Sequence, residues 1–285
     1  MYRNAMNDLY KWKAKKDKKP LIIRGARQVG KTWLMREFGR IAFDDMVYIN
    51  FDNNSQMKEL FSLDMRIERI ITGLELYVGH KIEPLNTLLV FDEVQEVPQA
   101  LAALKYFNEN APEYQIVCAG SLLGVALHGG TSFPVGKVEF LDLYPLSFTE
   151  FMRAMGRELF VELLEKQDFV MATTFKQEFI DLLKHYYYVG GMPEVVRNFA
   201  ADKDFGEVRE IQQRILDSYE QDFSKHAPNE IVPRIRMLWN SIPAQLTKEN
   251  KKFVYGIIKD GSRAKDYELA LMWLSDCGLV HKVHR

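Results

Sequence analysis

An eight-residue motif near the N-terminus limits the folds open to this chain more than any other feature. Residues 25–32 read GARQVGKT and match the pattern G-x-x-x-x-G-K-[ST], in which backbone amides surround a phosphate group. An apolar run at residues 20–23 precedes the motif and a helix-like run at residues 33–38 follows it. This is the strand–loop–helix context that the motif requires, so we predict an α/β protein that binds a phosphorylated ligand.

Each residue type in the motif has a physical reason. Gly25 and Gly30 lack a Cβ atom, so backbone N–H groups can close around phosphate oxygens at the positive end of the following helix. Lys31 is predicted to reach the β- and γ-phosphates of a nucleotide, and the Thr32 hydroxyl to bind Mg²⁺. The residues expected to contact the nucleotide are Gly25, Ala26, Arg27, Gln28, Val29, Gly30, Lys31, Thr32 and Trp33.

A second motif consists of an apolar strand that ends in two acids. Residues 87–93 read TLLVFDE. A buried parallel strand presents its carboxyl end to the crevice where ligands bind, and these acids would lie there. We predict that Asp92 holds Mg²⁺ through water and that Glu93 is the general base that polarises the attacking water. The alternative is a strand that ends in two solvated acids.

A third segment, residues 115–121, reads QIVCAGS and is predicted to be the next strand. In a parallel sheet, Ser121 would emerge beside Asp92 and Glu93. Its hydroxyl could then hydrogen-bond the attacking water or the γ-phosphate. Gly-Ser is also ordinary turn chemistry, so a plain turn is the alternative.

Short apolar segments alternate with helical patterns through residues 1–146, which we predict to be the nucleotide-binding core. The predicted strands are residues 21–24, 46–51, 87–91, 115–119 and 138–143, and the predicted helices include residues 58–77 and 99–108. Such alternation indicates a parallel sheet with right-handed crossovers. Apolar residues at three- and four-residue spacing predict a helical lid at residues 147–224.

Residues 225–285 are predicted to form a winged-helix-like module, with a middle helix at residues 253–258. This segment has 11 Lys and Arg against 6 Asp and Glu, whereas the rest of the chain has 27 against 33. A basic module on an acidic body is a hint of DNA binding. The expected recognition helix, however, carries Asp266, Glu268 and Asp276, which DNA phosphates would repel. Docking to a protein, or reporting the nucleotide state, is therefore an equal alternative.

Composition excludes several other classes of protein. No apolar run has the length of a membrane-spanning helix, and the N-terminus lacks the features of a secretion signal. We therefore expect a cytoplasmic protein without membrane contact. Cys118 and Cys277 lie in apolar segments and are expected to be buried thiols, and the six histidines form no metal-ligand pattern.

Taken together, these motifs resemble the AAA-like branch of the phosphate-loop ATPases. More narrowly, the chain resembles prokaryotic ATPases whose C-terminal region is known as domain of unknown function 4143. The stretches that carry the resemblance are residues 25–32, 89–95 (LVFDEVQ), 119–121 (AGS), 143–151 (LYPLSFTEF) and 188–196 (YVGGMPEVV).

The resemblance implies an ATPase that uses ATP and Mg²⁺, with Lys31, Glu93 and Ser121 as catalytic residues. It also implies that Pro193 packs against the adenine and couples the lid to the nucleotide state, although a plain helix–helix turn is the alternative. Relatives often have arginine where this chain has Lys137, which would then supply only a point charge at the phosphate. Relatives also continue beyond residue 285, so we expect a truncated chain.

The first hypothesis is an ATP-hydrolysing switch whose lid and C-terminal module respond to the nucleotide. The alternative is a DNA-binding regulator in which ATP sets the conformation and little hydrolysis occurs; a kinase fits the Asp92–Glu93 pair less well. Arg27, Arg153 and Arg197 offer no spacing argument for an arginine finger. Slow turnover is therefore expected unless a protein partner or a second copy supplies one.

Overall fold

The computed structural model divides into two compact units, residues 1–209 and residues 210–285. The residues that it describes are 1–120, 134, 136–249, 252–261 and 263–283. The helix α12 (Phe205–His226) begins in the first unit and ends in the second, and it continues through the predicted boundary at residue 224. The predicted division into core, lid and C-terminal module stays a prediction.

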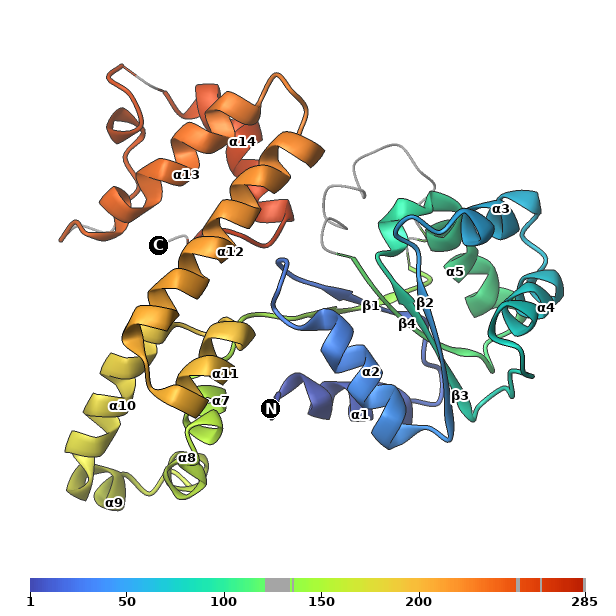
Figure 1. The fold of residues 1–285 in the computed structure, drawn as a ribbon, viewed down its shortest axis with the longest axis horizontal. Helices are drawn as coiled ribbons and strands as arrows, with labels where there is room; N and C mark the ends of the chain where they lie inside the picture. The colour runs from blue at the N-terminus through green and yellow to red at the C-terminus, as the bar shows by residue number, and fades with distance from the viewer. Residues whose placement is uncertain (121–133, 135, 250–251, 262, 284–285) are drawn as a thin grey trace. The chain divides into compact units, whose positions relative to one another are not determined.

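A five-stranded parallel sheet organises the first unit (Figure 1), in the order β2-β3-β4-β1-β5. The strands are β1 (Leu21–Arg24), β2 (Asp45–Asn50), β3 (Thr87–Asp92), β4 (Gln115–Ala119) and β5 (Glu139–Asp142). Because all five run in the same direction, their carboxyl ends share one edge, where Asp92 is in register with Asn50 and Ala119. The predicted α/β class and parallel sheet are confirmed.

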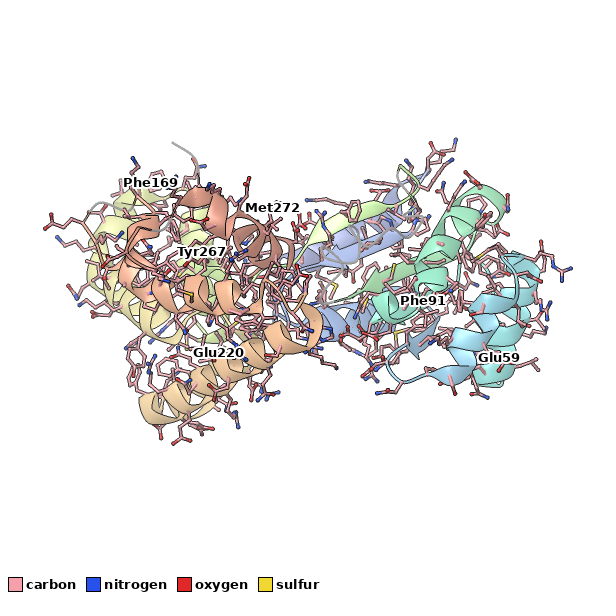
Figure 2. All side chains as sticks on the ribbon, turned by 90° about the horizontal axis from the view of Figure 1, so that it is seen from above. Glu59, Phe91, Phe169, Glu220, Tyr267 and Met272 are labelled. Atoms are coloured by element: carbon pink, nitrogen blue, oxygen red, sulfur yellow. The ribbon has the colours of Figure 1, made fainter. Side chains whose placement is uncertain are left out.

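Helices cover the sheet because its central strands β1, β3 and β4 are apolar and buried. The segments that flank the strands are α1 (Ala5–Ala14), α2 (Lys31–Ala42), α3 (Ser55–Leu63), α4 (Ile67–Val78), the 3₁₀ turn η1 (Val94–Glu96) and α5 (Pro98–Asn110). Phe91 of β3 lies inside this part of the molecule (Figure 2) and packs edge-on against Phe51 and Phe61 at ring distances of 5.4 and 6.0 Å. Such fully buried aromatic pairs fix the helices on the sheet.

The single helix predicted at residues 58–77 is wrong, because the structure has α3 and α4 there with a break at Asp64. The Asp64 carboxylate accepts a hydrogen bond from the Arg66 backbone N–H at 3.0 Å. It also accepts hydrogen bonds from the side chains of Arg66 and Arg69, each at 3.0 Å. A short acidic side chain that binds the backbone two residues on competes with helical hydrogen bonding, and here it ends one helix before the next begins.

Helices make up the rest of the first unit after β5. They are α7 (Phe148–Ala154), α8 (Glu158–Glu165), α9 (Phe169–Thr174), α10 (Lys176–Val189) and α11 (Pro193–Asp202). Ser147 and Glu150 form a capping box that begins α7. Gly190, at φ +73°, ends α10, and Pro193 occupies the first turn of α11, where a missing N–H costs nothing.

The second unit contains the end of α12, then α13 (Val232–Leu246), the 3₁₀ turn η2 (Tyr255–Ile257) and α14 (Ala264–Asp276). Its core includes Phe223, which packs edge-on against Trp239 and Trp273 at 5.5 and 5.7 Å. The middle helix predicted at residues 253–258 is wrong, since only η2 forms there; Gly256 disfavours a longer helix by about 1 kcal/mol. The described residues of this unit include no strand, and the winged-helix-like assignment stays a prediction.

Among the described residues, no helix combines the length and the apolar character that crossing a membrane would require.

Candidate functional site

The loop between β1 and α2 has a shape that requires glycine at two positions. Gly25 has φ +149°, and a Cβ atom there would lie 2.1 Å from the carbonyl oxygen of Leu143. Gly30 precedes α2 with φ +93°, and Gln28 is also in the left-handed region at φ +64°. Such a backbone is unfavourable for most residues and persists where the surrounding structure imposes it. The loop therefore curls around the N-terminus of α2, an end that favours anions.

Lys31 is buried inside this loop rather than extended into solvent. Its ammonium donates to the carbonyl oxygens of Gly25 and Ala26 at 2.8 and 2.7 Å. Burial lowers the pKa of Lys31 to about 8, although Glu93 and Asp92 act in the opposite direction. A nearby anion favours the charged form of a lysine. A phosphate in this loop would therefore lie beside a buried ammonium group.

The carboxylate of Asp92 is the point where three elements meet. Its Oδ2 accepts hydrogen bonds from the Thr32 hydroxyl of α2 at 2.6 Å and from the Tyr48 hydroxyl of β2 at 2.9 Å. Its Oδ1 accepts the backbone N–H of Glu93 at 3.1 Å. Asp92 is 3% exposed, so water cannot hydrogen-bond its carboxylate, and these three donors take the place of that water. Burial and the charge of Asp92 both raise the pKa of Tyr48, which keeps its hydroxyl protonated as a donor.

Glu93 follows at the end of β3 with its backbone in the left-handed conformation, at φ +52° and ψ +41°. Gln95 of η1 donates its Nε2–H to Glu93 Oε2 at 2.7 Å. A non-glycine residue held in this region stores strain of about 1–3 kcal/mol, and such residues concentrate at functional sites. The glutamate is therefore oriented both by its backbone and by a neighbouring amide.

A pocket of about 320 Å³ lies next to the phosphate loop. Its lining residues are Met1, Arg3, Gln28, Gly30, Trp33, Pro193, Glu194 and Arg197. A Cβ atom on Gly30 would lie 3.7 Å from Cγ of Pro193, so the proline ring faces the loop directly. An indole and a proline ring with a few polar groups around them are typical of a small-molecule site.

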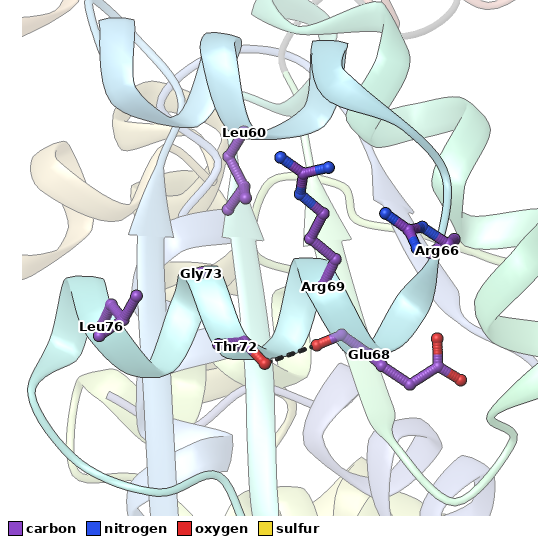
Figure 3. A pocket seen from close by; sticks show the side chains of 7 residues that line it. All are labelled: Leu60, Arg66, Glu68, Arg69, Thr72, Gly73 and Leu76. Atoms are coloured by element: carbon purple, nitrogen blue, oxygen red, sulfur yellow. Dashed lines mark hydrogen bonds between the residues drawn. The ribbon is translucent and has the colours of Figure 1, made fainter.

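A second, more open cavity of about 510 Å³ lies between α3 and α4 (Figure 3). Leu60 points from α3 toward α4, and Arg66 and Arg69 stand beside it. Both arginines pair with the one carboxylate of Asp64 at 3.0 Å, which offsets part of their charge. None of the residues predicted to bind nucleotide lines this cavity.

The structure brings together most of the residues predicted from the sequence. Residues 25–33, Asp92 and Glu93 lie at the carboxyl edge of the sheet, and Pro193 lies against Gly30. Ser121 lies outside the described residues, and its sensing role stays a prediction. Arg153 is engaged with Glu158 and Glu165 at 2.9 and 2.8 Å, within the helical part.

Lys137 would supply a point charge only if it reached the phosphate, and the structure places it elsewhere. Lys137 precedes β5, so it lies at the amino edge of the parallel sheet, whereas the loop follows the carboxyl end of β1. Its ammonium pairs with Glu109 of α5 at 2.8 Å. The strand direction places the two groups at opposite edges, and Lys137 has a structural partner there.

Four residues of the site were missed by the sequence analysis: Arg3, Tyr48, Gln95 and Glu150. Glu150 had a local signal, because Ser147-x-x-Glu150 is the spacing of a capping box. Tyr48 had only a weak one, as a polar side chain near the end of a predicted strand. Arg3 had none, since its hydrogen-bond partners are 26, 141 and 147 residues away in the chain.

Comparison with known proteins agrees with this geometry. Residues 17–152 match the family model described as an AAA domain. The matched segment, which includes the loop, Asp92 and Glu93, is therefore similar to an AAA domain. Residues 180–285 match a different model, a domain of unknown function (DUF8612), so the predicted C-terminal family, domain of unknown function 4143, is not the one found.

A solved structure of similar fold covers nearly the whole chain. A Walker-type ATPase of Pyrococcus abyssi is similar at a TM-score of 0.60 and 16% identity, covering 97% of this chain and 89% of the other. Weaker likenesses are AMPPCP-bound DnaA from Aquifex aeolicus (TM-score 0.39, 14% identity, 97% and 89% covered) and the DNA-bound Orc1 protein of Aeropyrum pernix (0.37, 13%, 98% and 84%). No curated protein matches the chain in sequence.

Proposed function

We propose that residues 1–209 bind ATP with Mg²⁺ and hydrolyse it to ADP and phosphate. The observation that carries this proposal is the 2.6 Å contact between Thr32 Oγ1 and Asp92 Oδ2, next to the buried Lys31 ammonium. This contact joins the start of α2 to the end of β3. One ligand could therefore contact the phosphate loop, the Thr32 hydroxyl and the carboxylates of Asp92 and Glu93 together. A triphosphate in the loop would take the place of the two carbonyl oxygens as the hydrogen-bond partner of Lys31.

The donor set fits magnesium. Thr32 and Asp92 supply hard oxygen atoms, and no group of three His, Cys, Asp or Glu side chains within the described residues could hold a metal ion alone. Mg²⁺ is usually bound by one or two protein ligands together with phosphate oxygens and water. When bound, the ion would neutralise phosphate charge and orient the phosphates.

The base of the nucleotide would occupy the pocket of about 320 Å³ beside Gly30. The Trp33 indole, which is 42% exposed, and the Pro193 ring offer it apolar surfaces. Because Pro193 begins α11, a bound base would contact the helical part of the first unit. This contact would couple the nucleotide state to movement of α11 and, through α12, to the second unit.

Glu93 would act as the general base that takes a proton from the attacking water, and the Gln95 amide would orient its carboxylate. Ser121 would assist at the γ-phosphate. Turnover by one chain would be slow, because arginine fingers contribute roughly 10³–10⁵ in rate and are often supplied by a partner. A protein partner or a second copy would raise it.

The test combines phosphate release with the binding of a fluorescent ATP analogue. Glu93→Gln should bind ATP as the wild type does and lose turnover by about 10²–10⁴, the usual contribution of a general base. Lys31→Ala should lose binding and turnover together. Glu59→Gln is the matched control, because Glu59 is an exposed carboxylate on α3, and it should behave as wild type.

Two results would contradict the proposal at different levels. Turnover that survives Glu93→Gln would show that another group is the base. A wild-type protein that takes up no nucleoside triphosphate in the presence of Mg²⁺ would remove the proposal as a whole.

A further inference from the structure

Arg3 connects the N-terminal segment to the phosphate loop. Its side chain is 4% exposed, and Nη1 donates a hydrogen bond to the carbonyl oxygen of Val29 at 2.8 Å. Nη2 donates to the carbonyl oxygen of Tyr144, which follows β5, at 2.6 Å. Nε pairs with Glu150 Oε1 at 3.2 Å. A buried guanidinium therefore contacts three separate segments of the chain.

The contact with Val29 has a geometric consequence at Gly30. The Val29 carbonyl and the Gly30 N–H belong to one planar trans peptide, in which the two groups point in opposite directions. A donor that holds the carbonyl on one side therefore turns the N–H to the other side, away from Arg3. In a loop that closes on phosphate through its amides, this N–H becomes available to the ligand.

Glu150 holds Arg3 in this position. Its Oε1 also accepts the backbone N–H of Asn4 at 2.6 Å, and its Oε2 accepts the backbone N–H of Ser147 at 2.8 Å. The residue is 4% exposed, so both of its oxygens are matched by donors within the protein. Because Ser147 and Glu150 begin α7, the same carboxylate links that helix to the arginine.

We propose that Arg3 is a positioning residue of the nucleotide site, which fixes the Val29–Gly30 peptide for phosphate binding, and that Glu150 links this peptide to α7. The inference rests on the proposed function, since it needs a phosphate in the loop. Its consequence is specific. Because Arg3 also lines the pocket proposed for the base, its loss should lower affinity for the phosphates more than affinity for the base.

The experiment compares wild type, Arg3→Met and Arg3→Lys by calorimetric titration with ADP, AMP and inorganic tripolyphosphate. Losing one hydrogen bond to a charged phosphate should weaken the binding of ADP and of tripolyphosphate by about ten- to hundredfold. The binding of AMP, which has a single phosphate, should weaken much less. Arg40→Met is the matched control, because Arg40 lies near the end of α2, is exposed and pairs with Glu37 at 2.7 Å. It should leave all three affinities unchanged.

Arg3→Lys keeps the inference testable if Arg3→Met does not fold. Lysine keeps the charge, but its three donors share one nitrogen and lack the spread of the guanidinium fork, whose separate nitrogens serve the Val29, Tyr144 and Glu150 oxygens. The selective loss of ADP and tripolyphosphate binding should therefore remain. An equal loss for AMP and ADP, or unchanged affinities with only a lower melting temperature, would mean that Arg3 is merely structural. If the wild type itself binds no nucleotide, the proposed function fails and this inference fails with it.

A separate measurement, amide hydrogen exchange, tests the link to α7. Tripolyphosphate should slow amide hydrogen exchange at residues 148–154 in the wild type and not in Arg3→Lys, at concentrations that saturate each protein. Equal slowing in both proteins would overturn the link through Arg3 and Glu150. The absence of slowing in the wild type would overturn it as well.

Discussion

Asp92 shows how much of the candidate site depends on the placement of single atoms. The two hydroxyls that share its Oδ2 come from different elements, Thr32 from α2 and Tyr48 from β2. If Thr32 turns to a magnesium ion, as we propose, Tyr48 remains to hold the carboxylate. The buried tyrosine would then keep Asp92 oriented whether or not a ligand is bound.

We expect Tyr48→Phe to weaken the magnesium dependence of nucleotide binding. The Mg²⁺ concentration for half-maximal ATP binding should rise about two- to tenfold, because one hydrogen bond to a charged group is lost and the ring is kept. Binding of ADP in EDTA should stay as in the wild type. Tyr77→Phe is the control, since the Tyr77 hydroxyl accepts a hydrogen bond from the Asn54 side-chain amide at 3.3 Å instead of holding Asp92. Equal behaviour of the two variants would remove the role assigned to Tyr48.

At the scale of elements, the segment after β5 and the turn between α10 and α11 fit closely together. Leu146 donates its N–H to the carbonyl oxygen of Gly191 at 2.6 Å, and the Leu146 carbonyl accepts the Tyr186 hydroxyl at 2.7 Å. A Cβ atom on Gly191 would lie 2.3 Å from the same Leu146 oxygen. Only glycine permits this approach, and the approach brings Pro193 to the phosphate loop.

Gly191→Ala should therefore destabilise the first unit. Overpacking of this kind costs about 1–3 kcal/mol, which corresponds to a fall in melting temperature of about 2–10 °C for a unit of this size. ATP affinity should fall as well, since Pro193 is displaced from Gly30. Gly256→Ala is the control, because Gly256 has an ordinary φ and nothing lies within 4 Å of an added Cβ. A first unit that melts at the wild-type temperature in Gly191→Ala would contradict this account.

At the scale of the whole molecule, one helix belongs to both compact units. The helix α12 begins in residues 1–209 and ends in residues 210–285, so it is the covalent route by which the nucleotide state could reach the second unit. The DNA-binding alternative gains little from that unit, because α14 exposes Asp266 and Glu268. These acids fit a protein-docking or reporting role better.

We expect ATP with Mg²⁺ to change amide hydrogen exchange in α11 and along α12. The Glu93→Gln protein suits this measurement, since the nucleotide stays intact during it. Exchange in α11 should slow because the base contacts Pro193, and the change should continue past residue 209. Lys31→Ala, which should not bind, provides the baseline. Changes that stop within the first unit would contradict the proposed coupling to the second.

Local chemistry made much of this protein predictable. The loop at residues 25–32 and the apolar runs of the strands carry their own signals, because glycine spacing and continuous apolar character are properties of neighbouring residues. The places where a helix is interrupted or stays short were harder to predict. The turn at Asp64 depends on which backbone group its side chain binds, and the single turn at residues 255–257 depends on how weakly Gly256 supports a helix.

The sequence by itself determined the parallel α/β core, the phosphate loop and the acids that end β3, since each follows from residues close together in the chain. Only the tertiary structure decided that Lys137 stands at the edge opposite the loop, because strand order and direction are set by packing. It alone joined Arg3 to Val29, Tyr144 and Glu150, partners 26, 141 and 147 residues distant. Contacts over such separations leave no local periodicity, and folding brings their atoms together through the burial of surfaces elsewhere.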